Sequence, residues 1–299
     1  MNGKNIRFIA YSAAVLFVLA AQVRSSDFAT EVVSSVGPFG GSPYDEPNSV
    51  LGKPTTKIYL PSFEIFSCSL VYPACFTDPN GEKLVTTLNS GAEIVVKFDH
   101  KVADDAGNPY GIDFIVFGNT MFRSDGWVAS DTDMEQYYLE SPTDVRPNEP
   151  VLISVSQDGN DWYEYTDGPY GDTAFPTNAY AWDRENHCWG EELDWTRPVD
   201  PNLTVDDFNG LSAADAIELY DGSAGGTGFD LAESGYEWIQ YIKVHGSEVG
   251  DIDGFADVSG CGDYKHPYPV GDINKDCKVN MEDFGLLAGH WLDCTWECP

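Results

Sequence analysis

A run of oxygen-bearing side chains near the C-terminus has the spacing of a calcium-binding loop. If Asp272 is the first of twelve positions, acids and amides fall at positions 1, 3, 5, 9 and 12, and position 7 can offer its carbonyl. Calcium prefers six to eight oxygen ligands, which such a loop supplies. The predicted ligands are Asp272, Asn274, Asp276, the carbonyl of Lys278, Asn280 and Asp283. The alternative interpretation is an acidic surface turn followed by a short helix.

Residues 271–294 resemble one repeat of a type I dockerin, the loop-and-helix module that docks secreted bacterial proteins onto cohesin domains. Asn280 at position 9 and Asp283 at position 12 are dockerin-like details. The sequence departs from the family at position 6, where Cys277 replaces the usual glycine, and in having one repeat where the family has two. The resemblance implies bound Ca²⁺ and a cohesin-like partner.

Apolar residues after the loop recur with the period of an amphipathic helix. They are Phe284, Leu287, Ala288, Trp291 and Leu292. A helix of about three turns is not stable alone in water, so we expect this apolar stripe to lie against the main domain or a partner. Cys277 and Cys294 bracket the helix, and a disulfide between them would join its end to the loop.

Several acids in the middle of the chain lie in or beside strand-like runs, where an unpaired carboxylate is expensive to bury. They are Asp99, Asp113, Asp230, Asp251 and Asp253. One hypothesis is a second calcium site formed by Asp113, Asp230, Asp251 and Asp253. The alternatives are solvated strand ends with side-chain caps on turns, or a catalytic acid pair of the kind that hydrolyses glycosidic bonds.

Aromatic residues are concentrated in the same part of the chain. They are Trp127, Tyr137, Tyr138, Trp162, Tyr163, Tyr165, Tyr170, Tyr180, Trp182, Trp189 and Trp195. Sugars stack on such rings, so a carbohydrate site is one interpretation; packing of long loops onto a sheet is the other. His187 and Cys188 could be a base and a nucleophile, although disulfide use of the cysteine is the expected alternative. The sequence contains no nucleophile elbow, P-loop, zinc-protease or dinucleotide motif, and we predict no catalytic residue.

Residues 1–25 have the pattern of a secretory signal peptide. Two basic residues precede an apolar run of about 14 residues, which is too short to span a bilayer comfortably. Cleavage after Ala21 or after Ser25 fits the pattern. Removal of residues 1–25 takes away Lys4, Arg7 and Arg24 but no acid, so the net charge changes from −33 to −36. We therefore expect a secreted or cell-surface protein with no membrane span after cleavage, and the charge argues against nucleic-acid binding.

The seven cysteines of an exported chain are expected to pair for the most part. Cys68 and Cys75 are close enough for a local loop, and Cys188, Cys261 and Cys298 remain after the bridge proposed above. The odd count leaves at least one cysteine unpaired or joined to another molecule.

Short alternating apolar runs separated by turn residues predict an antiparallel β-sandwich of jelly-roll type. Two hairpins are expected, 83–88 with 92–98 and 151–155 with 162–165. Further strands are expected at 112–117, 216–220, 238–244 and 252–258, with long insertions at 130–150 and 170–209. The predicted organisation is a signal peptide over 1–25, a β-sandwich domain over 26–265 and a dockerin-like segment over 266–299.

Five runs within the β domain resemble a domain of exported bacterial cell-surface proteins that is similar to galactose-binding-like jelly rolls. They are 50–54, 96–100, 111–119, 153–162 and 251–258. A shared sandwich hosts many functions, so this resemblance bears on fold more than on activity. The sequence thus favours a non-catalytic, calcium-binding exported module that binds a glycan or protein partner. The alternative is an enzyme or accessory subunit of extracellular polysaccharide degradation, which would be a hydrolase of O-glycosyl bonds.

Overall fold

The computed structural model shows a mainly β protein with antiparallel sheets and two short helices among the described residues, as the sequence predicts. The structure describes residues 26–59, 64–74, 85–124, 126–173, 175–258, 268, 270–274, 279 and 281–290. The predicted signal peptide and Cys75, Cys261, Cys277, Cys294 and Cys298 lie outside these residues. No helix in the described part is long and apolar enough to cross a membrane.

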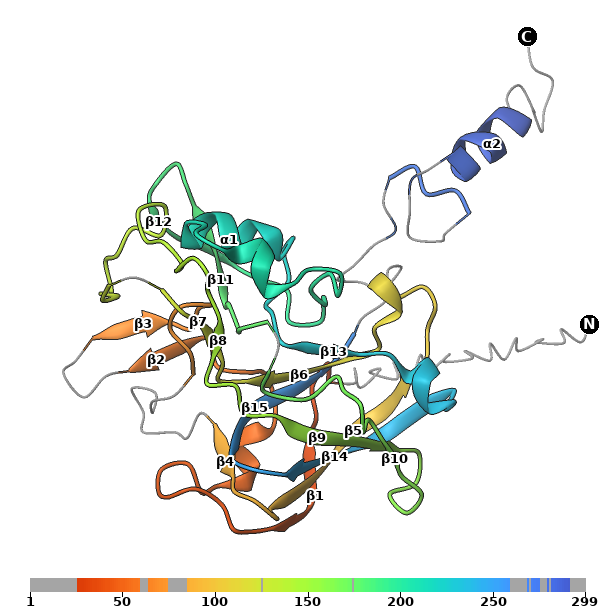
Figure 1. Cartoon of the computed structure of the whole chain (residues 1–299). Helices are drawn as coiled ribbons and strands as arrows, with labels where there is room; N and C mark the ends of the chain where they lie inside the picture. The colour runs from red at the N-terminus through yellow and green to blue at the C-terminus, as the bar shows by residue number, and fades with distance from the viewer. Residues whose placement is uncertain are drawn as a thin grey trace, which may run out of the picture.

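Two larger sheets form the body of the molecule (Figure 1). The first contains, in spatial order, β1 (Glu31–Val36), β5 (Glu93–Ala103), β14 (Trp238–Gly246), β9 (Val151–Ser156) and β10 (Tyr163–Glu164). The second contains β13 (Thr227–Phe229), β6 (Phe114–Gly118), β15 (Gly250–Asp257) and β4 (Thr86–Leu88). Every strand pair in both sheets is antiparallel.

One hydrophobic cluster takes side chains from both larger sheets, so the two sheets face each other across it. Along β5 the buried residues Ile94, Val96 and Phe98 alternate, as one face of a strand requires. From the other sheet, Phe114 of β6 stacks on Phe229 of β13 with ring centroids 4.8 Å apart. This shared core fixes the ends of β5, β6 and β13, which carry the acids described below.

The outer face of the second sheet is also covered. Ile115 and Phe117 of β6 belong to a separate cluster that includes Cys68 and Trp195. Beyond it, the long insertions form a third core around Phe122, together with three small hairpins and α1 (Ala213–Leu219). The hairpins are β2 (Lys57–Tyr59) with β3 (Ile65–Ser67), β7 (Met121–Phe122) with β8 (Val145–Arg146), and β11 (Tyr180–Asp183) with β12 (Cys188–Glu192). The described residues also form four 3-10 turns: η1 (Pro47–Val50), η2 (Pro109–Gly111), η3 (Val205–Phe208) and η4 (Leu231–Ser234).

Of the two predicted hairpins, one is present in the structure and the other is not. The pairing of β9 with β10 is confirmed, and Ser154 lies opposite Glu164. The hairpin predicted across the turn at 89–91 is wrong, because β4 pairs with β15 while β5 pairs with β1 and β14. Leu88 and Ile94 flank this turn and both enter the central core, so the turn carries the chain from one sheet to the other.

The strand predicted at 216–220 is also wrong, since α1 occupies this position. Ser212 caps the helix, and its side chain accepts a hydrogen bond from the Asp215 amide at 3.1 Å. Ala213, Ala214 and Ile217 are buried against the third core. A cap followed by alanines favours a helix over a short strand.

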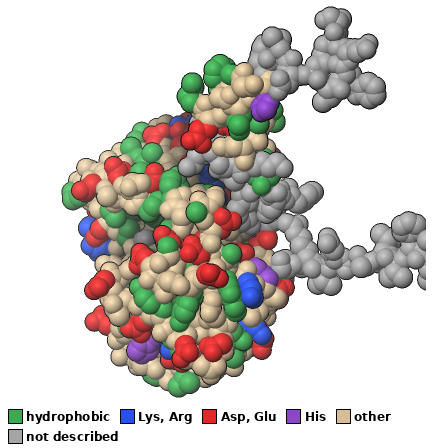
Figure 2. All heavy atoms as spheres, turned by 90° about the vertical axis from the view of Figure 1, so that its right-hand side faces the viewer, with side chains coloured by type: hydrophobic (Ala, Val, Ile, Leu, Met, Phe, Trp, Pro, Cys, Tyr) green, Lys and Arg blue, Asp and Glu red, His purple; other side chains and the backbone are tan. Residues whose placement is uncertain are grey.

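The helix α2 (Met281–Gly289) follows the predicted calcium loop and lies apart from the two larger sheets (Figure 1). Phe284 and Leu287 of the predicted apolar stripe are 59% and 44% exposed. Figure 2 shows acidic side chains over much of one face of the molecule and few basic ones, in keeping with 49 acids against 16 Lys and Arg.

Candidate metal centres and ligand cavities

Three acids converge at one end of the two larger sheets. Asp104 follows β5, Asp113 precedes β6 and Asp230 follows β13. Ligand oxygens of the three carboxylates lie within 4.8 Å of one another. The acids thus come from strand ends of both sheets, so a cation bound here would connect the sheets. A set of carboxylate oxygens suits a hard divalent cation such as Ca²⁺.

Asp113 is the most deeply buried member of this cluster. It is fully buried, and its Oδ1 accepts hydrogen bonds from the Asp105 amide at 3.0 Å and from Asn108 Nδ2 at 2.9 Å. Its Oδ2 accepts a hydrogen bond from the Leu231 amide at 2.8 Å. Burial raises the pKa of Asp113 to about 6, against the lowering effect of these hydrogen bonds. The negative charge of Asp104 raises this pKa further, and a bound cation would have the opposite effect.

Asp230 and Asp104 complete the cluster from its more accessible side. Asp230 caps η4, because its Oδ1 accepts a hydrogen bond from the Ala232 amide at 2.7 Å. Asp104 is exposed and is not among the residues predicted from the sequence. The strand predicted over 92–98 ends well before Asp104, whereas β5 continues to Ala103, so no sequence signal placed Asp104 at a strand end.

The four acids predicted for a second calcium site do not form one group. Asp113 and Asp230 lie together, but Asp251 and Asp253 lie toward the other end of β15, where Ile252 pairs with Gly118. Asp253 is buried and accepts hydrogen bonds from the amide and hydroxyl of Thr55, both at 2.8 Å. The structure therefore brings two of the four predicted acids together and places the other two near the opposite end of β15.

Asp251 belongs to a buried polar network with Asp172. Asp251 accepts hydrogen bonds from the Thr87 hydroxyl and from the side chain of Asn119. Asp172 accepts hydrogen bonds from the amides of Asn119 and Asp251, both at 2.9 Å, and burial raises its pKa well above the ordinary value. A Cβ atom on Gly118 would lie 2.1 Å from Asp172 Oδ1, so this position requires glycine. Asp172 joins the ends of β6 and β15 and is not among the residues predicted from the sequence.

Part of the predicted C-terminal calcium loop is described. Asp276, Lys278 and Asn280 lie outside the described residues, whereas Asp272, Asn274 and Asp283 lie within them. Asp283 is 2% exposed, and its Oδ1 accepts hydrogen bonds from the amides of Ile273 at 2.7 Å and Asn274 at 3.3 Å. These bonds bring the twelfth position of the loop back against the second and third.

A third group contains His187, Asp133 and Glu135. The imidazole Nδ1 lies 3.4 Å from Asp133 Oδ2 and 3.7 Å from Glu135 Oε2, and the three residues could also hold a metal ion. The neighbouring Cys188 is exposed and has no disulfide partner among the described residues. The expected disulfide at Cys188 is therefore not seen in this part of the chain, and the imidazole faces carboxylates.

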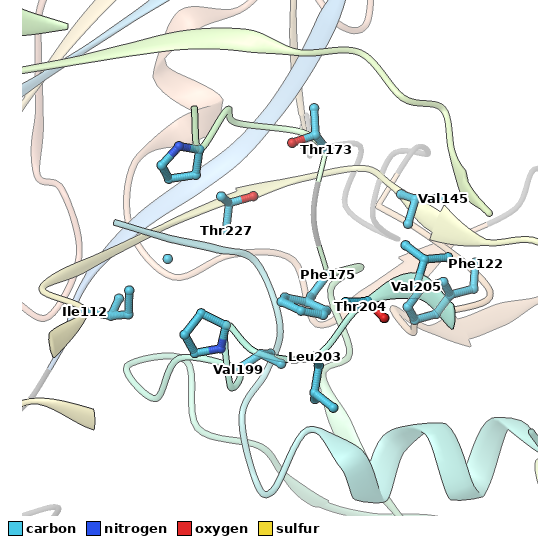
Figure 3. Close-up of a pocket in the computed structure, with 13 residues that line it drawn as sticks. Ile112, Phe122, Val145, Thr173, Phe175, Val199, Leu203, Thr204, Val205 and Thr227 are labelled. Atoms are coloured by element: carbon cyan, nitrogen blue, oxygen red, sulfur yellow. The ribbon is translucent and has the colours of Figure 1, made fainter. Parts of the chain in front are cut away.

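An apolar cavity of about 350 Å³ lies between the second sheet and the insertions (Figure 3). Its lining is Ile112, Phe122, Val145, Pro169, Thr173, Phe175, Val199, Pro201, Leu203, Thr204, Val205, Thr227 and Gly228. Two of the lining hydroxyls donate hydrogen bonds to other groups of the protein: Thr173 to the Tyr170 carbonyl and Thr204 to the Asp207 carboxylate. This lining offers a sugar few polar groups.

A second cavity, of about 300 Å³, is also largely apolar, but charged side chains are among its lining residues, as is usual for ligand sites. Trp127, which is 83% exposed, lines this cavity together with Tyr72 and the ion pair of Arg123 with Glu140. Other aromatic residues of the predicted set pack inside: Tyr137, Tyr165 and Trp195 are buried.

No protein-family model and no curated protein matches this chain.

Proposed function

We propose that this chain is an exported, calcium-binding, non-catalytic module. In this proposal a jelly-roll-like β-sandwich binds a glycan or a protein partner, and a dockerin-like tail attaches the module to a cohesin-like protein. The observation that carries the calcium-binding part of the proposal is the convergence of Asp104, Asp113 and Asp230 from the ends of both larger sheets. Three carboxylates at this separation repel one another, and a divalent cation would turn that repulsion into a link between the sheets.

The tail supplies the second proposed calcium site. Asp283 already contacts the start of the loop through the amides of Ile273 and Asn274, which supports a loop closed around an ion. Phe284 and Leu287 are exposed on α2, and their burial would favour docking of this helix on a partner surface. A cohesin-like protein is the partner that the dockerin resemblance implies.

The cavity beside Trp127 is the proposed glycan site. An exposed indole offers a stacking face, and the Arg123–Glu140 pair offers donors and acceptors to hydroxyls.

Isothermal titration with Ca²⁺ tests the metal part of the proposal. The wild type is expected to bind two ions per chain. Asp104→Asn with Asp230→Asn should remove one ion, and Asp272→Ala with Asp276→Ala should remove the other. Asp161→Asn changes an exposed acid outside both groups and should leave both ions. Unchanged stoichiometry in either double variant contradicts the corresponding site.

A glycan array tests the binding part. Trp127→Ala should abolish the signal of any glycan that the wild type retains. Tyr138→Ala, which changes an exposed aromatic residue that does not line this cavity, should keep the signal. Hydrolysis of a polysaccharide by the wild type would instead favour the enzyme hypothesis.

A further inference from the structure

The backbone nitrogen of Ser26 lies in a cradle formed by one carboxylate. It is 3.3 Å from Asp99 Oδ1 and 3.2 Å from Asp99 Oδ2. A peptide N–H has a single hydrogen, which the two oxygens would have to share. An ammonium group has three hydrogens and can donate one to each oxygen. The cradle therefore fits a chain terminus better than an internal amide.

The charges around this cradle also favour a cation. His100 lies between two acids, with Nδ1 2.8 Å from Asp99 and Nε2 2.8 Å from Asp257. The hydrogen bond with Asp257 is the main cause that raises the pKa of His100 to about 9, so the ring is an imidazolium at neutral pH. Two carboxylates and one imidazolium leave one negative charge, and Asp27 contributes another near Asp257. An ammonium at Ser26 would neutralise part of this charge.

Contacts with β15 hold Ser26 at the cradle. The Asp257 amide donates a hydrogen bond to the Asp27 carbonyl at 2.8 Å, and Phe28 forms a β-bridge with Ala256. The Ser26 hydroxyl accepts a hydrogen bond from the Phe28 amide at 3.2 Å. Chain ends are ordered when such contacts tie them down, so this segment is suited to be the start of the folded protein.

The sequence before Ser26 has the pattern of a leader that ends at this position. Small residues at positions −1 and −3 are typical of signal-peptide cleavage sites, and Ser25 and Val23 stand there if cleavage follows Ser25. We propose that the leader peptidase of the exporting cell hydrolyses the Ser25–Ser26 bond, and that the resulting α-ammonium of Ser26 binds Asp99. The hydrolysis consumes one water and leaves a carboxylate on Ser25 and an ammonium on Ser26. The proposal rests on the proposed export of the chain.

The cleavage position is tested by the intact mass of the full chain after expression and export in a bacterial host. Exported protein that begins at Ser26 is the expected result. Exported protein that begins at Gln22 overturns the cleavage site but leaves export standing. Uncut protein retained in the cell contradicts both export and cleavage.

The ammonium contact is tested on purified protein, independently of export. Chains that begin at Ser26 and at Gln22 are compared, each with and without Asp99→Asn. The variant should lower the Tm of the Ser26 chain by about 2–4 °C more than that of the Gln22 chain, as expected for one charge-assisted hydrogen bond in a protein of this size. Asp161→Asn should affect both chains equally.

Acetylation of Ser26 gives a second measurement that needs no variant. It removes the charge and two hydrogens while keeping Asp99, and it should lower the Tm of the Ser26 chain by a similar amount. An equal effect of Asp99→Asn in the two chains, or no effect of acetylation, overturns binding of the terminus by Asp99.

Discussion

Replacement of Asp253 with asparagine is expected to change how stability depends on pH. Asp253 is 2% exposed, and its only described donors are the amide and hydroxyl of Thr55. An asparagine can keep both contacts, because its oxygen can accept from the amide and its NH₂ group can donate to the hydroxyl oxygen. The variant therefore removes the charge of residue 253 and leaves its hydrogen bonds in place.

The size of the effect follows from the pKa of Asp253. Burial raises this pKa from 3.8 to about 7, although both bonds from Thr55 lower it. The folded chain thus holds the proton more tightly than the unfolded chain. The stability that this residue contributes is greatest below about pH 4 and is lost as the pH rises to about 7. The full loss is on the order of 4 kcal/mol, at about 1.4 kcal/mol for each tenfold change in proton affinity.

Urea unfolding at several pH values between about 4 and 8 measures this difference. The free energy of unfolding of Asp253→Asn, minus that of the wild type, should grow by several kcal/mol across this range. Asp161→Asn serves as the control, because its acid is exposed on the turn between β9 and β10. A difference that stays constant with pH would refute the assignment of Asp253 as a buried acid with a raised pKa.

Three further predictions concern single residues. The hydrogen bonds of His100 with Asp257 and Asp99 raise its pKa to about 9. Its contribution to the free energy of unfolding is therefore full below about pH 6.5 and is lost as the pH rises through about 9. His100→Gln should remove this pH dependence from urea unfolding, and an unchanged dependence would contradict the prediction. Ser212→Ala removes the cap of α1 and should lower the free energy of unfolding by about 1 kcal/mol, measured by circular dichroism; no change would refute the role of the cap. Cys188 is exposed, so iodoacetamide should alkylate it in the native protein, and its absence from labelled peptides would contradict this exposure.

Local patterns predicted most strands of the two larger sheets, but only one of the two predicted hairpin pairings is present. Runs rich in apolar residues predicted β5, β6, β14 and β15, because each of these strands buries apolar side chains in the central core. The turn at 89–91 has the composition of a hairpin turn, and composition does not distinguish a turn within one sheet from a turn between two. That difference depends on the partners of β4, which are about 160 residues further along the chain.

The candidate metal centre could be predicted only in part for the same reason. Asp113 and Asp230 attract attention because each adjoins an apolar strand, and both lie in the cluster. Asp104 has the same position relative to β5, but an acid in an acidic loop carries no distinguishing local signal. Asp172 was missed because its role depends on Gly118 and on two backbone amides from distant strands.

The buried acids of this protein differ in whether a proton alone or a cation is needed to compensate their negative charge. Asp172 and Asp253 each accept two hydrogen bonds, and burial raises the pKa of both, so a proton can remove the cost of their charge. Asp113 also has its donors, but it shares its surroundings with Asp104 and Asp230, and one proton cannot neutralise three carboxylates. A divalent cation can contact all three carboxylates at once and offset two of their three charges. The stabilising effect of Ca²⁺ should therefore depend on this cluster, and it should weaken as acid protonates Asp113.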